Sequence, residues 1–280
     1  MEEPVPMGCL RKTTCLPALS QVFAGGGQVI RSLHEVKGQK GLVLQEYFAG
    51  HGVIPKGWRA ANQTALEPIE LYAQPHQQLG PRPEHDLADP LRQEHFLGRL
   101  RAKESNVQWI ASPCTTFCDW CLQNGGTRTF QNPEGLPTAK EQLGNTLSAY
   151  GAKVFETSLM QGGFPIAESS GTSGRYPKQW HLPQWRRLLQ RPDVDFIEID
   201  MCAFGLGPPD TVGQFYRHRT GLAFPHHPPL RQALLRLCPG VSASHQHIAL
   251  KGNRPGVHVS RVKATAPLVK NWGASSIWLE

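Results

Sequence analysis

Short apolar runs alternate with longer amphipathic stretches from Gly41 onward, and this alternation sets the first expectation for the fold. The runs that predict strands are 42–48, 65–71, 107–110, 164–167, 194–199 and 221–224. Such short runs are typical of strands buried in a sheet. Because strand and helix signals alternate, the pattern predicts an α/β protein with an open, mostly parallel, Rossmann-like sheet and helices on both faces.

Two stretches carry the clearest helical pattern. Leu143, Leu147, Tyr150 and Val154 recur at helical spacing after Pro137,. A second helix is predicted over residues 90–102. In an open α/β sheet, ligands usually bind beyond the carboxyl ends of the strands, so candidate chemistry is sought there.

The pattern also divides the chain into three parts. Residues 1–40 lack sustained periodicity and are expected to be an extension or linker, whereas residues 41–238 form the α/β domain. Residues 239–280 are expected to be a basic C-terminal segment. Glu280 is its single acid, and it contains five basic residues: Lys251, Arg254, Arg261, Lys263 and Lys270. This segment and the formal net charge of +7 favour a polyanionic partner such as nucleic acid,.

Composition narrows the cellular setting. The 280 residues contain no apolar run near the ~20 residues that a membrane-spanning helix needs,. The chain starts with two acids where a secretory signal carries basic residues,. Seven cysteines are too few and too dispersed for a disulfide framework,. We therefore expect no membrane association, reduced thiols and an intracellular location, nuclear or cytoplasmic.

Glycines and acids follow the first two predicted strands. The first strand runs into Phe48-Ala49-Gly50-His51-Gly52, a turn whose glycines would let the backbone approach a ligand closely,. Glu67 ends the second strand, where a carboxylate can accept hydrogen bonds from ribose hydroxyls. Asp86 lies where a further strand is expected to end. Together these features predict a nucleotide-like cofactor site.

Reactive side chains follow the next strands. The loop 112–121, SPCTTFCDWC, raises Cys114 at a strand end behind Pro113, which suits a nucleophile,. Glu168 ends the following strand and could act as a general acid or bond a substrate ring. Arg217 and Arg219 precede the last strand, and Arg128 lies in the loop beyond Cys114, where it could reach a phosphate.

The order of these features resembles that of the cytosine-C5 DNA methyltransferases, which use S-adenosylmethionine. The order is glycine turn, acid, Pro-Cys loop, strand-end Glu, Phe204-Gly205-x-x-Pro208 and Arg-x-Arg. The match covers residues 42–225 and is closest to shorter, divergent modules in mobile-element or virus-like reading frames. Two motifs depart from the family. Its loop reads Pro-Cys-Gln with a serine four residues after the cysteine, whereas here it is Pro-Cys-Thr with Cys118 in the serine place, and its Glu-Asn-Val is Glu168-Ser-Ser.

The resemblance implies a role for each matched residue. Those assigned to the methyl donor are Tyr47, Phe48, Gly50 and Gly52, with Glu67 at its ribose and Asp86 at its adenine. Cys114 would attack C6 of a cytosine taken out of the DNA duplex, and Glu168 would bond the ring near N3. Arg219, with Arg217, would position the pyrimidine. The substitutions also allow a catalytically inactive nucleic-acid-binding module.

The three thiols of the loop leave other interpretations open. Cys114, Cys118 and Cys121 have the Cys-x3-Cys-x2-Cys spacing of the cluster loop of radical S-adenosylmethionine enzymes,. The same thiols with His245 or His247 could bind zinc. The interpretation we prefer makes Cys114 the nucleophile and Cys118 and Cys121 small buried packing residues. Cys202 and Cys238, which flank apolar stretches, are expected to be core residues.

Overall fold

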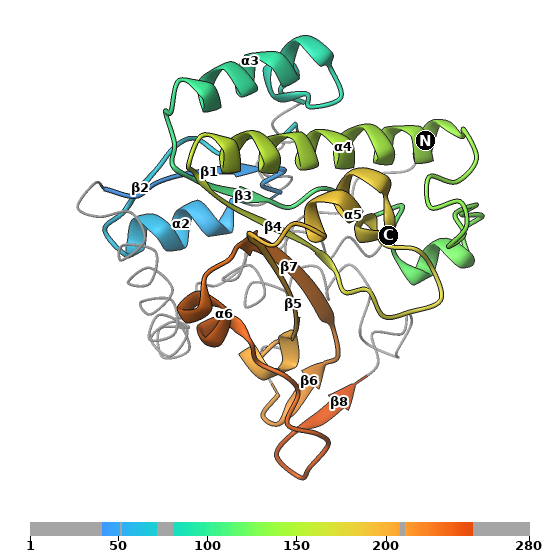
Figure 1. The fold of residues 1–280 in the computed structure, drawn as a ribbon. Coiled ribbons are helices and arrows are strands. Elements are labelled where there is room, and N and C mark those ends of the chain that lie inside the picture. The colour runs from blue at the N-terminus through green and yellow to red at the C-terminus, as the bar shows by residue number, and fades with distance from the viewer. Residues whose placement is uncertain (1–40, 51, 72–80, 208–210, 249–280) are drawn as a thin grey trace, which may run out of the picture.

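The computed structural model describes residues 41–50, 52–71, 81–207 and 211–248 (Figure 1). The strands are β1 (Val43–Tyr47), β2 (Thr64–Ala65), β3 (Val107–Ile110), β4 (Phe164–Ser170), β5 (Val194–Asp200), β6 (Gln214–Tyr216), β7 (Arg219–Pro225) and β8 (Gln246–Ile248). The α-helices are α2 (Val53–Ala60), α3 (Pro90–Arg101), α4 (Ala139–Met160), α5 (Pro183–Leu189) and α6 (Pro228–Leu234). Four 3-10 turns are η2 (Pro83–His85), η3 (Asp119–Leu122), η4 (Gln179–His181) and η5 (Met201–Phe204).

Six strands form one sheet in the order β2-β1-β3-β4-β7-β5. The pairs from β2 to β4 are parallel, whereas β7 lies antiparallel between β4 and β5. This confirms the expected open and mostly parallel α/β sheet. A second, two-stranded sheet pairs β6 with β8 in parallel.

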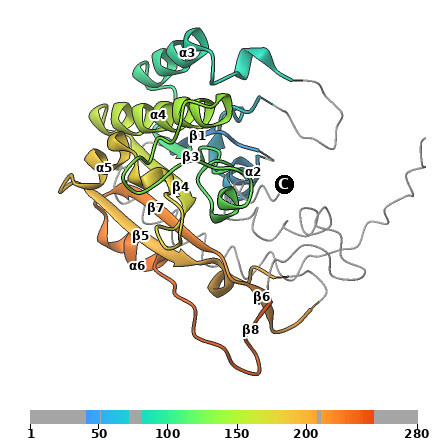
Figure 2. The ribbon, with the colours of Figure 1, turned by 90° about the vertical axis from the view of Figure 1, so that its right-hand side faces the viewer.

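Helices cover both faces of the large sheet (Figures 1 and 2). On one face, α3, α4 and α5 pack through a cluster that includes Phe96, Tyr150 and Trp185. On the other, α2 and α6 pack through a cluster that includes Trp58 and Leu230. Successive side chains of each strand point to opposite faces of the sheet, so each strand contributes to both clusters. This explains why the strands appear in the sequence as nearly continuous apolar runs.

The two predicted helices are confirmed, and local sequence explains where they begin. Asp89 caps α3 by accepting a hydrogen bond from the Leu91 N–H at 2.9 Å,. Thr138 caps α4 in the same way for the Glu141 N–H at 3.3 Å. In the described part of the chain, no helix is long and apolar enough to cross a membrane.

Three local expectations differ from the structure. The strand expected over 65–71 shortens to Thr64–Ala65 and one bridge between Tyr47 and Ile69, because Pro68 lacks the N–H that a ladder requires. No strand ends at Asp86 among the described residues, and a 3-10 turn precedes it. Strand β8 lies beyond the expected boundary at residue 238 and pairs with β6 of the domain.

Candidate functional site

The sheet has a topological switch point between β1 and β3. The chain leaves β1 through α2 toward β2 on one side, and leaves β3 through α4 toward β4 on the other. The two connections diverge there and open a crevice at the carboxyl ends of the strands, the usual place for a ligand in such folds. A cavity of about 410 Å³ lies at this place. Its lining includes Phe48, Ile69, Glu70, Asp86, Leu87, Pro113, Thr115, Thr116, Leu143 and Leu147.

The turn after β1 forms one wall of this cavity and is held in a strained conformation. Phe48, Gly50 and Gly52 all have φ between 52° and 60°. A left-handed conformation is easy for glycine but costs about 1 kcal/mol or more for Phe48. A side chain at Gly52 would also come within 3.3 Å of Pro68. The backbone therefore turns sharply next to the cavity, and Phe48 is one of the residues that line it.

Tyr47, assigned to the same cofactor by resemblance, points elsewhere. Its ring is 2% exposed and lies in the core cluster beneath α3 and α4, where it meets Tyr150 edge-on at 6.3 Å. Side chains alternate across a strand, so Tyr47 at the end of β1 faces the helices while the cavity opens beyond it. Tyr47 supports the site through packing.

The acid that reaches the cavity is Glu70, three residues after the one expected. Glu70 lines the cavity, and its Oε2 accepts a hydrogen bond from the Gly50 N–H at 2.7 Å. The Glu67 side chain is 68% exposed and pairs with Arg82 at 2.7 Å. The early end of β2 explains the difference, because the chain continues past Glu67 before it turns into the crevice.

Asp86 also lines the cavity, although no strand ends there among the described residues. It follows η2, and its Oδ1 accepts the Ala88 N–H at 2.9 Å, which fixes the carboxylate against its own loop,. Glu70 and Asp86 thus place two acids on a wall that is otherwise mainly apolar. This combination suits a ligand with an apolar ring and several hydroxyl groups.

Cys114 and Glu168 are brought together because β3 and β4 are parallel neighbours. The Cys114 thiol is 5% exposed and Glu168 is 1% exposed. Burial raises the pKa of Cys114 to about 11; a hydrogen bond with Ser170 opposes the rise, and the charge of Glu168 adds to it. Cys114 is therefore a thiol at neutral pH, and a reaction through it requires a proton acceptor. Ser170, two residues after Glu168, is one of the two serines that replace the Asn-Val of the resembled family.

A second buried acid lies at the same edge and was missed from the sequence. Glu46 in β1 is fully buried, and neither carboxyl oxygen has a hydrogen-bond partner among the described residues. Burial raises the pKa of Glu46 well above its usual range, and the charges of Glu168 and Glu70 raise it further against the influence of Lys56. Burial and the neighbouring acids thus favour the protonated form of Glu46. The signal in the sequence was an acid inside an otherwise apolar strand.

Arg219 lies at the same strand ends but is engaged by an acid. In the antiparallel ladder Arg219 faces Asp200, and Nε and Nη2 donate to the two carboxylate oxygens at 2.9 and 3.0 Å. Although burial alone would raise it, the hydrogen bonds from Arg219 and from the Cys238 N–H hold the pKa of Asp200 below its usual value. Arg219 also packs against Gly171, next to the end of β4. Arg217 is exposed.

Arg128 is part of the loop's internal framework and does not face outward toward a phosphate. It is 3% exposed, and its guanidinium donates to the carbonyl oxygens of Thr116, Pro133 and Glu141 at 2.8, 2.7 and 3.2 Å. It also lies 4.0 Å from the ring centre of Phe117. Arg128 therefore holds the loop that carries Cys114 against the start of α4.

The two other thiols of the loop pack against each other. Cys118 and Cys121 have their sulfur atoms 3.7 Å apart, and Cys121 Sγ lies 3.1 Å from the Thr115 carbonyl oxygen. The three loop thiols do not converge as one ligand group; in the described part of the chain, the convergent group of this kind contains four other residues. The geometry thus favours the packing interpretation over an iron–sulfur cluster.

Known proteins offer only distant likenesses. No protein-family model matches the chain, and a search of curated proteins finds no match. Among solved structures, the chain is similar to the Dnmt2 methyltransferase of S. pombe, with 14% identity and a TM-score of 0.39 over 66% of this chain and 49% of that one. It is also similar to a DNMT2 mutant of Spodoptera frugiperda, with 9% identity and a TM-score of 0.37 over 78% of this chain and 56% of that one. The chain spans about half the length of these two structures.

Proposed function

We propose that the protein is an S-adenosylmethionine-dependent methyltransferase that acts on cytosine C5 in nucleic acid, with DNA as the expected substrate. One observation carries the proposal. A cavity with two acids lies at the β1/β3 switch point, and the buried pair Cys114 and Glu168 lies at the same sheet edge. A cavity that could hold the cofactor and a candidate nucleophile thus lie at one edge, which supports the proposal because methyl transfer requires the two to be close.

The residues of the cavity fit the cofactor by chemistry. S-adenosylmethionine supplies an electrophilic methyl group. Phe48, Ile69 and Leu87 offer apolar surface for its adenine, while Glu70 and Asp86 can accept hydrogen bonds from ribose hydroxyls or the adenine amino group,. In this proposal Glu70 takes the ribose role that the sequence suggested for Glu67.

The chain's own residues account for the substrate steps. Cys114 gives its proton to the Glu168 carboxylate, which passes it to N3 of cytosine as the Cys114 sulfur bonds to C6,. The addition makes C5 nucleophilic enough to take the methyl group. A base then removes the C5 proton, and elimination releases the Cys114 sulfur. Glu168 stabilises the ring by a hydrogen bond near N3. Because Cys114 starts as a thiol with a raised pKa, we infer that substrate binding must first lower that pKa.

The first experiment tests the cavity by calorimetric titration of the purified chain with S-adenosylmethionine. We expect saturable one-to-one binding that Glu70→Gln weakens about 10-fold or more, because a hydrogen bond to a charged group contributes about 1.5–3 kcal/mol. Glu67→Gln is the matched control and should leave the affinity unchanged. If the folded chain does not bind the cofactor, or if the two variants behave alike, the assignment of the cavity is wrong.

The second experiment tests the nucleophile. DNA and RNA oligonucleotides are incubated with radiolabelled cofactor and with wild-type or Cys114→Ser protein, and label in the nucleic acid is counted. We expect transfer by the wild type and none by Cys114→Ser, which should still bind the cofactor. An oligonucleotide with 5-fluorocytosine should trap a covalent adduct on Cys114, because fluorine cannot leave as the proton does. Transfer by Cys114→Ser would contradict the mechanism, and salt-dependent DNA binding without transfer would favour a non-catalytic module.

A further inference from the structure

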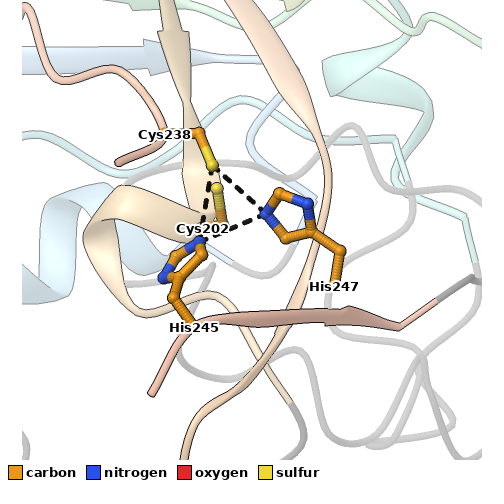
Figure 3. A group of neighbouring side chains, drawn as sticks. All are labelled: Cys202, Cys238, His245 and His247. Carbon is orange, nitrogen blue, oxygen red and sulfur yellow. Dashed lines mark hydrogen bonds between the residues drawn. The ribbon is translucent and has the colours of Figure 1, made fainter. Parts of the chain in front are cut away.

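Four potential metal ligands converge at a place well separated in the sequence from the Cys114 loop. They are Cys202 in η5, Cys238 after α6, and His245 and His247 at the start and middle of the β8 segment (Figure 3). One ligand atom from each lies within 4.8 Å of all the others. The sequence pattern suggested core packing for Cys202 and Cys238, but the fold brings both thiols to the two imidazoles.

The separations match a tetrahedral site. With Zn–S of about 2.3 Å and Zn–N of about 2.05 Å, tetrahedral geometry requires N···N of about 3.3 Å and S···N of about 3.6 Å. The two Nε2 atoms of His245 and His247 are 3.2 Å apart. The Cys238 sulfur lies 3.5 Å from the first and 3.3 Å from the second. These three atoms are thus spaced as three corners of a tetrahedral site, and the Cys202 sulfur lies within 4.8 Å of each of them.

Protons alone cannot turn each of the three contacts into a hydrogen bond of its own. An imidazole Nε2 either carries a proton and donates, or has a lone pair and accepts, but it does not do both. In the triangle of His245, His247 and Cys238, whichever Nε2 donates to the other has no proton left for the sulfur and no lone pair to accept from it. One close contact therefore always lacks a hydrogen bond. A metal ion removes the conflict, because it takes a lone pair from each ligand.

The surroundings hold the ligands in place. The Phe215 ring stacks on the His245 ring at 4.4 Å with an angle of 18°, which fixes the plane of the imidazole. The Gly240 N–H donates to the Cys238 sulfur at 3.3 Å, a contact that stabilises a thiolate,. Strand periodicity puts His245 and His247, two residues apart, on the same face. Each of these features is expected around a metal centre with preformed ligands.

From this geometry we propose that Cys202, Cys238, His245 and His247 bind one Zn²⁺ in a closed structural site. Two thiolates and two imidazoles in tetrahedral array are the ligand set that zinc prefers. All four positions are filled by protein, so no position is open for a substrate, as in structural rather than catalytic centres. The inference is independent of the proposed methyl transfer.

The site joins three parts of the chain that also share backbone hydrogen bonds, such as the one from the Asp200 N–H to the Arg236 carbonyl oxygen at 3.0 Å. Zinc would connect the end of β5, the segment after α6 and the small β6–β8 sheet. Asp200 extends the link, because its Oδ2 accepts both the Cys238 N–H and one N–H of Arg219. The metal would thereby set the position of Arg219 at the strand ends, although it lies outside the cavity at β1 and β3.

The test is metal analysis of the full-length chain purified without chelators. We expect close to one zinc ion per chain, and X-ray absorption at the zinc edge should show two sulfur ligands near 2.3 Å and two nitrogen ligands near 2.0 Å. Reconstitution with Co²⁺ should give the intense visible absorption of tetrahedral coordination and a thiolate charge-transfer band. These readouts use the wild-type chain and do not depend on whether a variant folds.

Variants locate the ligands. Cys238→Ser and His247→Asn should lose most of the zinc, whereas Cys121→Ser, a thiol of the other loop, should keep it. The proposal is overturned if the folded wild-type chain holds no zinc and does not bind Co²⁺. It is also overturned if absorption data show three sulfur ligands and zinc disappears with Cys121→Ser but persists with Cys238→Ser, because the metal would then belong to the Cys114 loop.

Discussion

Arg128 offers the most direct test of how the Cys114 loop is held. Replacing it by Met keeps the apolar stem but removes every donor. The Thr116 carbonyl and hydroxyl oxygens, which accept from the guanidinium at 2.8 and 3.1 Å, then stay buried without it. The contact with the Phe117 ring at 4.0 Å is lost as well.

The magnitude follows from these contacts. Two buried acceptors that lose their donor cost about 1–3 kcal/mol each, and a desolvated cation over an aromatic ring contributes about 1–2 kcal/mol. Acceptors nearer the surface, such as the Pro133 carbonyl and Asn145 Oδ1, can bond water instead and add little. These contributions sum to about 3–8 kcal/mol. Because the loop can relax around the new side chain, we expect Arg128→Met to lower the free energy of unfolding by the lower part of this range, about 3–5 kcal/mol, as for other broken buried charge networks.

Urea unfolding followed by tryptophan fluorescence measures this change, and the midpoint should fall by about 1–2 M. Arg175→Met is the matched control, because the Arg175 side chain is exposed. Mass spectrometry after brief thiol labelling provides a second measurement, since a released loop should expose Cys114. If Arg128→Met costs less than about 1 kcal/mol, or no more than Arg175→Met, the guanidinium does not hold the loop.

Two further predictions concern buried charge. Burial raises the pKa of Glu46, so the wild type should lose stability as the pH rises from the unfolded value of about 4.3 through the raised folded value,. Glu46→Gln should flatten that decline in melting temperatures measured from pH 5 to 9, and an unchanged slope would contradict a protonated Glu46. Asp119→Ala leaves the Lys178 ammonium, 3% exposed and 2.7 Å from the carboxylate, without its partner. Because Asp119 is half exposed, we expect Asp119→Ala to lower the free energy of unfolding in urea by about 1–3 kcal/mol, and adding Lys178→Met should partly restore it. Equal losses of stability in the single and double variants would rule out the coupling between the two side chains.

Local sequence was enough for the sheet and its two best helices. Apolar runs and caps such as Asp89 act over a few residues, so they can be read without the fold. Cys114 lies beside Glu168 because strand ends of a parallel sheet gather at one edge,. The strand expected to end at Asp86 does not form among the described residues, although Asp86 lines the cavity. The antiparallel placement of β7 left no local signal, because pairing partners are chosen by the whole sheet.

The rest of the site depends on distant contacts. Glu70 replaces Glu67 at the cavity because β2 ends early, which is a matter of register and backbone hydrogen bonding around Pro68. Arg128 looked like a surface cation because its acceptors lie up to 17 residues away along the chain. Cys202 and His247 lie in segments that are distant in the sequence and meet only in the folded chain. Their spacing in the sequence therefore does not indicate the group of four potential metal ligands.

The position of β7 has a consequence for how the chain reaches this structure. β7 fills the gap between β4 and β5, although it is made after both, so the sheet cannot close until residues 219–225 have left the ribosome. Until then β4 and β5 each present an unpaired edge rich in apolar side chains, which is prone to join other chains. Nascent chains stalled before Arg219 should therefore depend on chaperones, whereas chains released with β7 complete should not.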